Sequence, residues 1–237
     1  MSKIDRRFLE GGDAGGGGIT IAQLVAAIAM GKWTDQTIPV AIWHAVCWSP
    51  ERGLFCAVGR NGIAATSPDG VTWTKRMLPT GNWTDICYSS GLGVFCVVGN
   101  GRAATSTDGE NWTAYTMPNM YNDILVCWSP ELKLFCAVAS HGKAATSPDG
   151  KNWTERTMPA SDRRGICWSS ELGVFCVVAN DNSVSSPDGE AWTTRTLFPG
   201  TWAAVCWSKE LGIFCAVGGN GKAATSTPLF LVSIPLR

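Results

Sequence analysis

The chain has 237 residues, and its 19 lysine and arginine residues balance its 19 aspartate and glutamate residues, so the formal net charge at pH 7 is zero. This balance provides no basic field of the kind that attracts nucleic acid or an anionic membrane surface, and we expect neither as a partner. The length suits one domain of about 195 residues with an arm at each end.

Residues 1–31 differ in composition from the rest of the chain. A charged decapeptide, MSKIDRRFLE, is followed by the glycine-rich stretch GGDAGGGG and then by the apolar run ITIAQLVAAIAM. Twelve apolar residues are too few to span a bilayer, so no membrane insertion is expected. A secretory signal peptide is the alternative, but acidic residues and glycines before the apolar run are unusual for one. We predict an N-terminal docking arm over residues 1–31.

A unit of about forty residues then recurs five times, which is the signature of a repeat architecture. Each unit contains a cysteine followed by an aromatic residue: Cys47 with Trp48, Cys87 with Tyr88, Cys127 with Trp128, Cys167 with Trp168, and Cys206 with Trp207. The unit ends in Trp-Thr-x-x-Thr-x-Pro, seen as Trp112 to Pro118 and Trp153 to Pro159, but the fifth unit stops at Ser226 without this segment. The same pattern instead precedes the first unit, as Trp33 to Pro39.

Four short strands are predicted in each unit, and in the first unit they cover Ala45 to Ser49, Leu54 to Gly59, Ile63 to Ser67 and Trp73 to Met77. The segments PERG, RNG and SPDG between them are rich in residues that form hairpin turns. Radial repetition of four-stranded antiparallel units describes blades of a propeller. We therefore predict an all-β fold, a five-bladed β-propeller over residues 32–227, in which Trp33 to Pro39 completes the last blade and closes the ring.

The ten cysteines occupy matched positions in these hairpins. If Ser49 and Leu54 close the first hairpin, Cys47 lies opposite Cys56 and Trp48 opposite its aromatic partner; the last hairpin likewise pairs Cys206 with Cys215. Alternation along the strands places both cysteines on one face of the sheet and both aromatic residues on the other. Free thiols in an apolar core are the favoured interpretation, and five cross-strand disulfides are the alternative. The chain has no CxxC motif or His–Cys cluster that would indicate zinc, and no metal or cofactor is expected.

A turn motif, Ser-x-Asp-Gly-x-x-Trp, precedes the fourth strand of four units. It reads SPDGVTW (Ser67 to Trp73), STDGENW (Ser106 to Trp112), SPDGKNW (Ser147 to Trp153) and SPDGEAW (Ser186 to Trp192). It resembles the Asp-box, or BNR repeat, of sialidases and other propellers, with one residue fewer between Asp and Gly. In this turn we expect Asp to cap backbone amides, Gly to adopt a positive φ, and Trp to anchor the next strand.

The repeats also look like those of propellers in bacteriophage virion and tail-associated proteins. The resemblance rests on runs such as CWSPELKLFCAVASHGKAATSPDGKNWT, and it covers nearly all of residues 32–227. By analogy it implies a structural or adsorption protein of a phage, located in the virion and made in the host cytoplasm. Fold resemblance alone does not establish activity.

No enzymatic activity is expected. The resemblance to sialidases would imply an arginine cluster, a tyrosine nucleophile with its glutamate, and an acid/base aspartate, but the chain has three tyrosines, of which only Tyr121 falls in a variable loop. The acidic residues recur at equivalent turn positions in several units, as Asp69 and Asp149 do. A catalytic site breaks the symmetry of a repeat, whereas these groups follow it.

Comparison of the units with one another predicts a binding face at one end of the blades. The turns between second and third strands and the connections between blades differ from unit to unit and lie on that side, which we call the variable face. Aromatic planes beside amide and carboxyl groups suit a carbohydrate or another small polar ligand. The alternative is that the aromatic residues plug the ring and the Asn-Gly pairs are ordinary turns. The candidate residues are Trp43, Asn61, Trp83, Asn100, Tyr121, His141, Arg163, Asp181, Trp202 and Asn220.

The tail, residues 228–237, is apolar, and its exposure to water would be unfavourable and would promote aggregation. We predict that Phe230, Leu231, Val232 and Ile234 dock on a partner, with packing on the propeller's own edge as the alternative. The sequence thus predicts a phage virion protein held to other virion proteins by its N-terminal arm and its tail, with the variable face outward. The alternative function is a lectin-like module that binds a host-surface glycan or receptor.

Overall fold

A computed structural model describes residues 34–227 except 119, 122, 160, 161 and 181. Almost all of these residues belong to one compact unit, Thr37–Arg237. The predicted arm (1–31), Trp33 and the predicted tail (228–237) lie outside the described residues. Within them, no helix is long and apolar enough to cross a membrane.

The described residues form five antiparallel sheets, four with four strands and one with three. The first contains β1 (Trp43–Ser49), β2 (Leu54–Gly59), β3 (Ile63–Ser67) and β4 (Thr74–Met77), and the short 3₁₀ turn Arg60–Gly62 joins β2 to β3. The second contains β5 (Asp85–Ser89), β6 (Val94–Gly99), β7 (Arg102–Ser106) and β8 (Thr113–Thr116), and the third contains β9 (Leu125–Ser129), β10 (Leu134–Ala139), β11 (Lys143–Ser147) and β12 (Thr154–Thr157). The fourth contains β13 (Arg163–Ser169), β14 (Val174–Ala179), β15 (Ser183–Ser186) and β16 (Thr193–Arg195), and the fifth contains β17 (Trp202–Ser208), β18 (Ile213–Gly218) and β19 (Ala223–Thr225).

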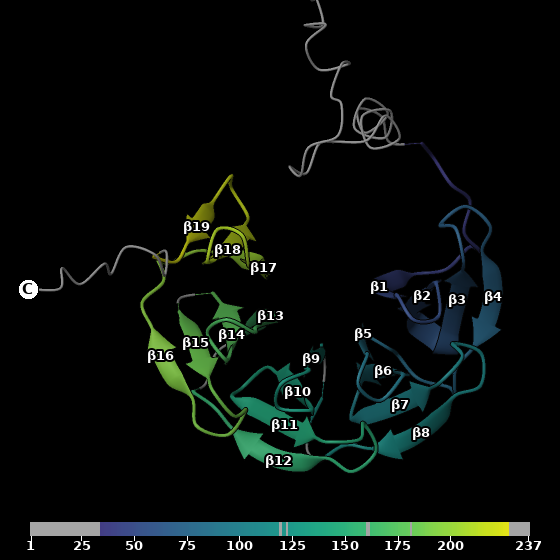
Figure 1. Ribbon diagram of the computed structural model, residues 1–237, viewed down its shortest axis with the longest axis horizontal. Coiled ribbons are helices and arrows are strands. Elements are labelled where there is room, and N and C mark those ends of the chain that lie inside the picture. The colour runs from purple at the N-terminus through teal and green to yellow at the C-terminus, as the bar shows by residue number, and fades with distance from the viewer. Residues whose placement is uncertain (1–33, 119, 122, 160–161, 181, 228–237) are drawn as a thin grey trace, which may run out of the picture. The chain divides into compact units, whose positions relative to one another are not determined.

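The sheets follow one another around a centre, as blades do. Figure 1 shows β1, β5, β9, β13 and β17 innermost, and consecutive members of this set are in contact along the chain. The order within each sheet follows the sequence, from the inner strand outward. The all-β prediction and the five repeated units are confirmed, and we call the sheets blades 1 to 5.

The predicted hairpin register is confirmed. Cys47 pairs with Cys56 and Trp48 with Phe55 in blade 1, and Cys206 pairs with Cys215 in blade 5. The Trp48 and Phe55 rings lie 4.5 Å apart between centroids. All ten cysteines are free thiols.

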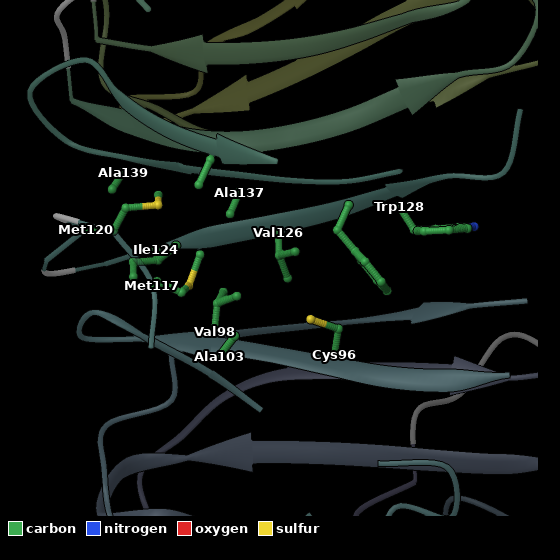
Figure 2. Close-up of a cluster of buried hydrophobic side chains, with 12 residues drawn as sticks. Cys96, Val98, Ala103, Met117, Met120, Ile124, Val126, Trp128, Ala137 and Ala139 are labelled. Carbon is green, nitrogen blue, oxygen red and sulfur yellow. The ribbon is translucent and has the colours of Figure 1, made fainter. Parts of the chain in front are cut away.

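The cysteine face of each blade packs against the aromatic face of the next. Figure 2 shows this for blades 2 and 3, where Cys96 and Val98 lie across from Val126 and Trp128. The same alternation places Cys56 of blade 1 with Phe95 of blade 2. Small side chains therefore meet large ones, which allows the sheets to pack closely without voids.

The Ser-x-Asp-Gly-x-x-Trp turns, for which we keep the name Asp-box because of their resemblance to that motif, form the hydrogen bonds that the sequence predicts. In blade 1, Asp69 Oδ1 accepts hydrogen bonds from the amides of Val71 and Thr72 at 2.8 and 2.7 Å. Gly70 has a φ of 75°, a conformation that suits glycine. Trp73 Nε1 donates to the Gly70 carbonyl at 3.0 Å, which ties the turn to the start of β4.

The closing strand is the part of the fold prediction that this structure does not contain. Residues 34–39 form no strand, and blade 5 has three strands where the other blades have four. Residues 34–37 are exposed, so this stretch buries little surface to offset the entropy lost on ordering. No backbone hydrogen bonds of the described residues close the ring.

Candidate functional site

The variable face is the end of the blades where the inner strands begin. Strand register places Trp43 opposite Gly59, Arg163 opposite Ala179 and Trp202 opposite Gly218. The turn after the second strand of a blade and the start of its first strand therefore lie together. The residues that the sequence places on one side of the propeller are thus at one end of the sheets.

A cavity of about 670 Å³ opens at this end and is lined by residues from all five blades. We call it the central cavity. Its lining comprises His44, Arg60, Thr84, Asp123, Leu125, Arg163, Arg164, Asn180, Thr201, Trp202, Ala203 and Gly219. Two residues of the predicted site, Arg163 and Trp202, belong to this lining, and several others are immediate neighbours of residues that do.

Four predicted polar residues serve first as turn residues. Asn61, Asn100, His141 and Asn220 have φ values between 46° and 63° and are exposed. Each precedes a glycine that also has a positive φ. This pair of conformations is that of a tight hairpin turn, for which Asn-Gly is the favoured sequence. The ordinary-turn alternative accounts for these positions.

The predicted tryptophans are largely core residues. Trp83 has no exposed surface, and Trp202 is 3% exposed. Trp83 Nε1 donates to the Pro79 carbonyl at 3.0 Å, and Trp43 and Trp202 form the equivalent bond four residues back. The prediction that Trp83 offers a stacking surface is therefore wrong, because its ring is enclosed between blades 1 and 2.

Tyr121 lies apart from this arrangement. Tyr121 is 64% exposed, and it is not among the residues that line the central cavity. Asp181 lies outside the described residues. The structure thus brings only part of the predicted site together.

Sequence reasoning missed four charged or titratable lining residues, His44, Arg60, Asp123 and Arg164. The repeat register holds a signal for one of them, because the position four residues before the first cysteine of each unit is Trp43, Trp83, Asp123, Arg163 and Trp202 in turn. Arg60 Nε donates to His44 Nε2 at 3.3 Å, which links the turn between β2 and β3 to the inner strand β1. These residues become neighbours only when the blades are arranged around a centre.

Arg163 is the most unusual charged group in the described chain. Its side chain is buried, with 3% of its surface exposed. One guanidinium nitrogen, Nη2, donates to the Pro159 carbonyl, while Nε and Nη1 have no hydrogen-bond partner within the described part of the chain. Burial lowers the pKa of this guanidinium to about 10, which still leaves it charged at neutral pH.

Asp85 is a buried carboxylate between the inner strands of blades 2 and 3. Burial raises its pKa to about 6, against the effect of amide hydrogen bonds from Val126 and Ile86. Those bonds engage both of its oxygens, each at 2.9 Å. The carboxylate joins two blades and both of its oxygens already accept hydrogen bonds, so it is a poor candidate for a catalytic base.

Within the described ranges, no group of three or more His, Cys, Asp or Glu side chains could hold a metal ion. One carboxylate, Asp123, lines the central cavity. His44, also in the lining, already accepts a hydrogen bond at Nε2. The described lining is therefore a polar recess with cationic side chains and a single carboxylate.

The chain matches no family model and no curated protein. Among solved structures it is similar to a catalytically inactive variant of virginiamycin B lyase from Staphylococcus aureus, at 12% identity and a TM-score of 0.63 over 81% of this chain and 71% of that one. It is also similar to YCF48 from Cyanidioschyzon merolae, at 15% identity and a TM-score of 0.63 over 81% and 69%. A third structure, the GH74 enzyme of Niastella koreensis, has 16% identity and a TM-score of 0.63 over 79% of this chain and 29% of that one. Enzymes and other proteins share this architecture, so the likeness establishes the β-propeller fold and leaves the activity open.

Proposed function

We propose that this protein is a non-enzymatic interaction protein of a bacteriophage particle, which binds through its variable face. The observation that carries the proposal is the central cavity, whose side chains differ from blade to blade while the turns at the other end repeat. A residue shared by every blade serves the fold, whereas residues that differ at one cavity serve what that cavity binds. The placement in a phage rests on the resemblance of the repeats.

The absence of catalytic activity is part of this proposal. Hydrolysis of a glycosidic bond needs two carboxyl groups on either side of the bond, and the described residues of the central cavity include one, Asp123. The aspartates of the Asp-boxes are engaged in turns, as Asp69 and Asp108 are. Arginine, histidine, amide and indole groups around a recess suit recognition of a polar ligand.

Closure of the ring is the structural part of the proposal. In blades 2 to 4, Trp112, Trp153 and Trp192 of the Asp-boxes pack against the core that their own blade shares with the preceding one. Blade 5 lacks an Asp-box, and an apolar cavity of about 660 Å³ lies between blades 4 and 5. We infer that residues 33–39 add to β19 as the fourth strand of blade 5, with Trp33 filling this cavity.

The ion pairs between blades support the same inference. Arg76 of β4 pairs with Glu110 in the next blade at 2.8 Å, and Arg156 of β12 pairs with Glu190. The equivalent residue of blade 4 is Arg195, which donates to Ser185 Oγ and lines the apolar cavity between blades 4 and 5. No carboxylate of the described residues forms an ion pair with it. Arg195 at the edge of blade 4 therefore lacks the acidic partner from the next blade that Arg76 and Arg156 have, and the described part of blade 5 does not supply one.

Proteomics of purified particles tests the proposed location. Particles released from host cells that carry the gene are purified by density, and peptides of this chain are sought by mass spectrometry. We expect the chain in a fixed ratio to the other particle proteins. A structure of the assembled particle then shows whether the variable face points outward. Absence of the chain from intact particles would exclude a virion role.

A glycan array tests the alternative function, a glycan- or receptor-binding module. Labelled protein is applied to the array and to whole host cells. Binding by a protein that is absent from particles would favour the lectin-like module over the virion protein. The five blades resemble the tachylectin type of lectin in number, although its sequence repeats differ.

A further inference from the structure

The central cavity contains a cation that the fold itself does not neutralise. Nε and Nη1 of Arg163 have no hydrogen-bond partner among the residues that the structure describes, and they are closed to solvent. Among the described residues, no carboxylate forms an ion pair with this side chain. A buried, unpaired charge is costly, and proteins rarely retain one without a compensating group.

The repeat shows what this position needs for folding. Trp43, Trp83 and Trp202 occupy it in blades 1, 2 and 5, and each indole Nε1 donates to the carbonyl four residues earlier at 3.0 Å. Arg163 Nη2 forms the same bond to Pro159. Tryptophan therefore meets the structural requirement, and arginine adds a positive charge that the fold does not require.

The surroundings of Arg163 increase the positive charge. Arg60 and Arg164 line the same cavity, and Asp123 is the one carboxylate among its described lining residues. Arg60 Nε is bonded to His44, which fixes its position and leaves its terminal nitrogens available. Among the described residues, three formal positive charges thus face one negative charge across a recess with low-dielectric walls, where the potential is stronger than on an open surface.

We propose that the central cavity binds an oxyanion, the carboxylate, sulfate or phosphate group of a small polar ligand, with Arg163 as its main charge partner. Arginine binds such groups through two parallel hydrogen bonds, and these charge-assisted bonds are among the strongest in proteins. A volume of about 670 Å³ admits a ligand of the size of an acidic sugar. This inference rests on the proposed binding role of the variable face and specifies its ligand chemistry.

Three matched sugars test the inference by titration calorimetry on the folded full-length protein. Glucuronate and glucose 6-phosphate carry the oxyanion, glucose does not, and the first two distinguish a carboxylate from a phosphate source. We expect at least one anionic sugar to bind at least about tenfold more tightly than glucose, a difference of ~1.4 kcal/mol. Equal binding of all three sugars, or no binding of either anion, would overturn the inference.

The matched variant is Arg163→Trp, because it restores the residue of three other blades. It should keep or raise the melting temperature and weaken binding of the anionic sugar at least about tenfold. Arg52→Gln, which removes an arginine from the exposed turn at the far end of β1, should leave binding unchanged. Should Arg163→Trp fail to fold, Arg163→Gln provides the same charge loss. Unchanged anion binding in a folded Arg163 variant would refute the assignment.

The oxyanion inference and the proposed binding role can fail separately. Binding of neutral glycans on the array, with no response to either anionic sugar, would retain the variable face as a binding surface and reject the oxyanion. Loss of anion binding in Arg163→Trp, with the chain absent from particles, would retain the oxyanion site and reject the virion role.

Discussion

Trp83 holds blade 2 against blade 1 at the end where the inner strands begin. Its ring is fully buried with Val58 and Leu78 of blade 1, and its Nε1 hydrogen bond to Pro79 is the only polar interaction that its side chain can form. Truncation therefore leaves both a cavity and an unpaired carbonyl. The residue belongs to the core, although the sequence predicts a role in binding.

Replacing Trp83 with alanine tests that assignment. We expect Trp83→Ala to lower the free energy of unfolding by about 3–5 kcal/mol, the usual cost of removing a buried aromatic ring. Tyr121→Ala, at the exposed member of the predicted site, should change stability by less than about 0.5 kcal/mol. Urea denaturation of both variants measures the difference. Equal stabilities would place Trp83 outside the core.

The Asp-box aspartates make stability depend on pH. Hydrogen bonds from the amides of Thr72 and Val71, and then from Ser67, lower the pKa of Asp69 from its ordinary 3.8 to about 2. A carboxylate with a depressed pKa stabilises the folded state above pH 3.8, and this contribution is lost as the pH falls through about 2. The turn should therefore weaken in acid.

Asp69→Asn isolates this effect, because asparagine accepts the same two amide hydrogen bonds but does not titrate. We expect the melting temperature of the wild type to exceed that of the variant at pH 5 and the gap to shrink as the pH approaches 2. The other three Asp-boxes titrate in both proteins, so their effect cancels in the difference. A gap that stays constant with pH would show that the carboxylate charge does not stabilise the turn.

At the scale of strands and turns, most of the architecture is readable from the sequence. The register of Cys47 with Cys56 follows from hairpin alternation, and the bounds of β2 and β3 agree with prediction, because these elements are fixed by local pattern and turn chemistry. The strand predicted over residues 33–39 depends instead on contact between the two ends of the repeat array. Local pattern alone does not determine that contact.

The candidate site was less predictable for a related reason. Variation between blades marks Arg163 and Trp202, which line the central cavity, but it does not distinguish a residue that faces the cavity from one enclosed between blades. Trp83 and Trp202 occupy the same repeat position, yet only Trp202 lines the cavity. Arg60 and His44 meet through a side-chain contact that spans 16 residues of sequence. Such proximity follows from the three-dimensional arrangement of the blades.

The hairpin cysteines allow a prediction about oxidation state. Burial raises the pKa of Cys56 to about 12, so the thiolate that would attack a disulfide is scarce at neutral pH. We expect ten free thiols when the protein is denatured without a reductant, alkylated and weighed by mass spectrometry. A mass that corresponds to five bridges would show that the paired cysteines oxidise during maturation.

At the scale of the whole propeller, the two end blades present surfaces that the other blades bury. Val46 and Trp48 of blade 1 are 58% and 41% exposed, whereas the equivalent Val126 and Trp128 of blade 3 are buried. Val217 of blade 5 is 49% exposed, whereas the equivalent Val58 is fully buried. Burying these side chains against each other would be favourable, because apolar contact area stabilises in proportion to its size. Blades 1 and 5 are thus complementary partners.

The reactivity of Cys206 shows whether blades 1 and 5 are in contact. Cys206 lies on the face of blade 5 that corresponds to the face of Cys127 in blade 3, but it is exposed and Cys127 is half-buried. If residues 33–39 close the ring, blade 1 covers Cys206, and iodoacetamide should modify it in the folded protein as slowly as Cys127. Removal of residues 1–38 should then raise the rate at Cys206 alone, lower the melting temperature and expose an edge that promotes aggregation.

Truncation at residue 38 keeps Pro39, whose carbonyl accepts the hydrogen bond of Trp43, so blade 1 retains its own contacts. Removal of residues 1–32 is the matched control, since it discards the arm but leaves Trp33 and the closing segment in place. This shorter truncation should leave both the Cys206 rate and the melting temperature close to those of the full chain. The alternative result is fast modification of Cys206 in all three proteins with equal melting temperatures. It would mean that the five blades are stable as an open array and that residues 33–39 serve a partner instead of the ring.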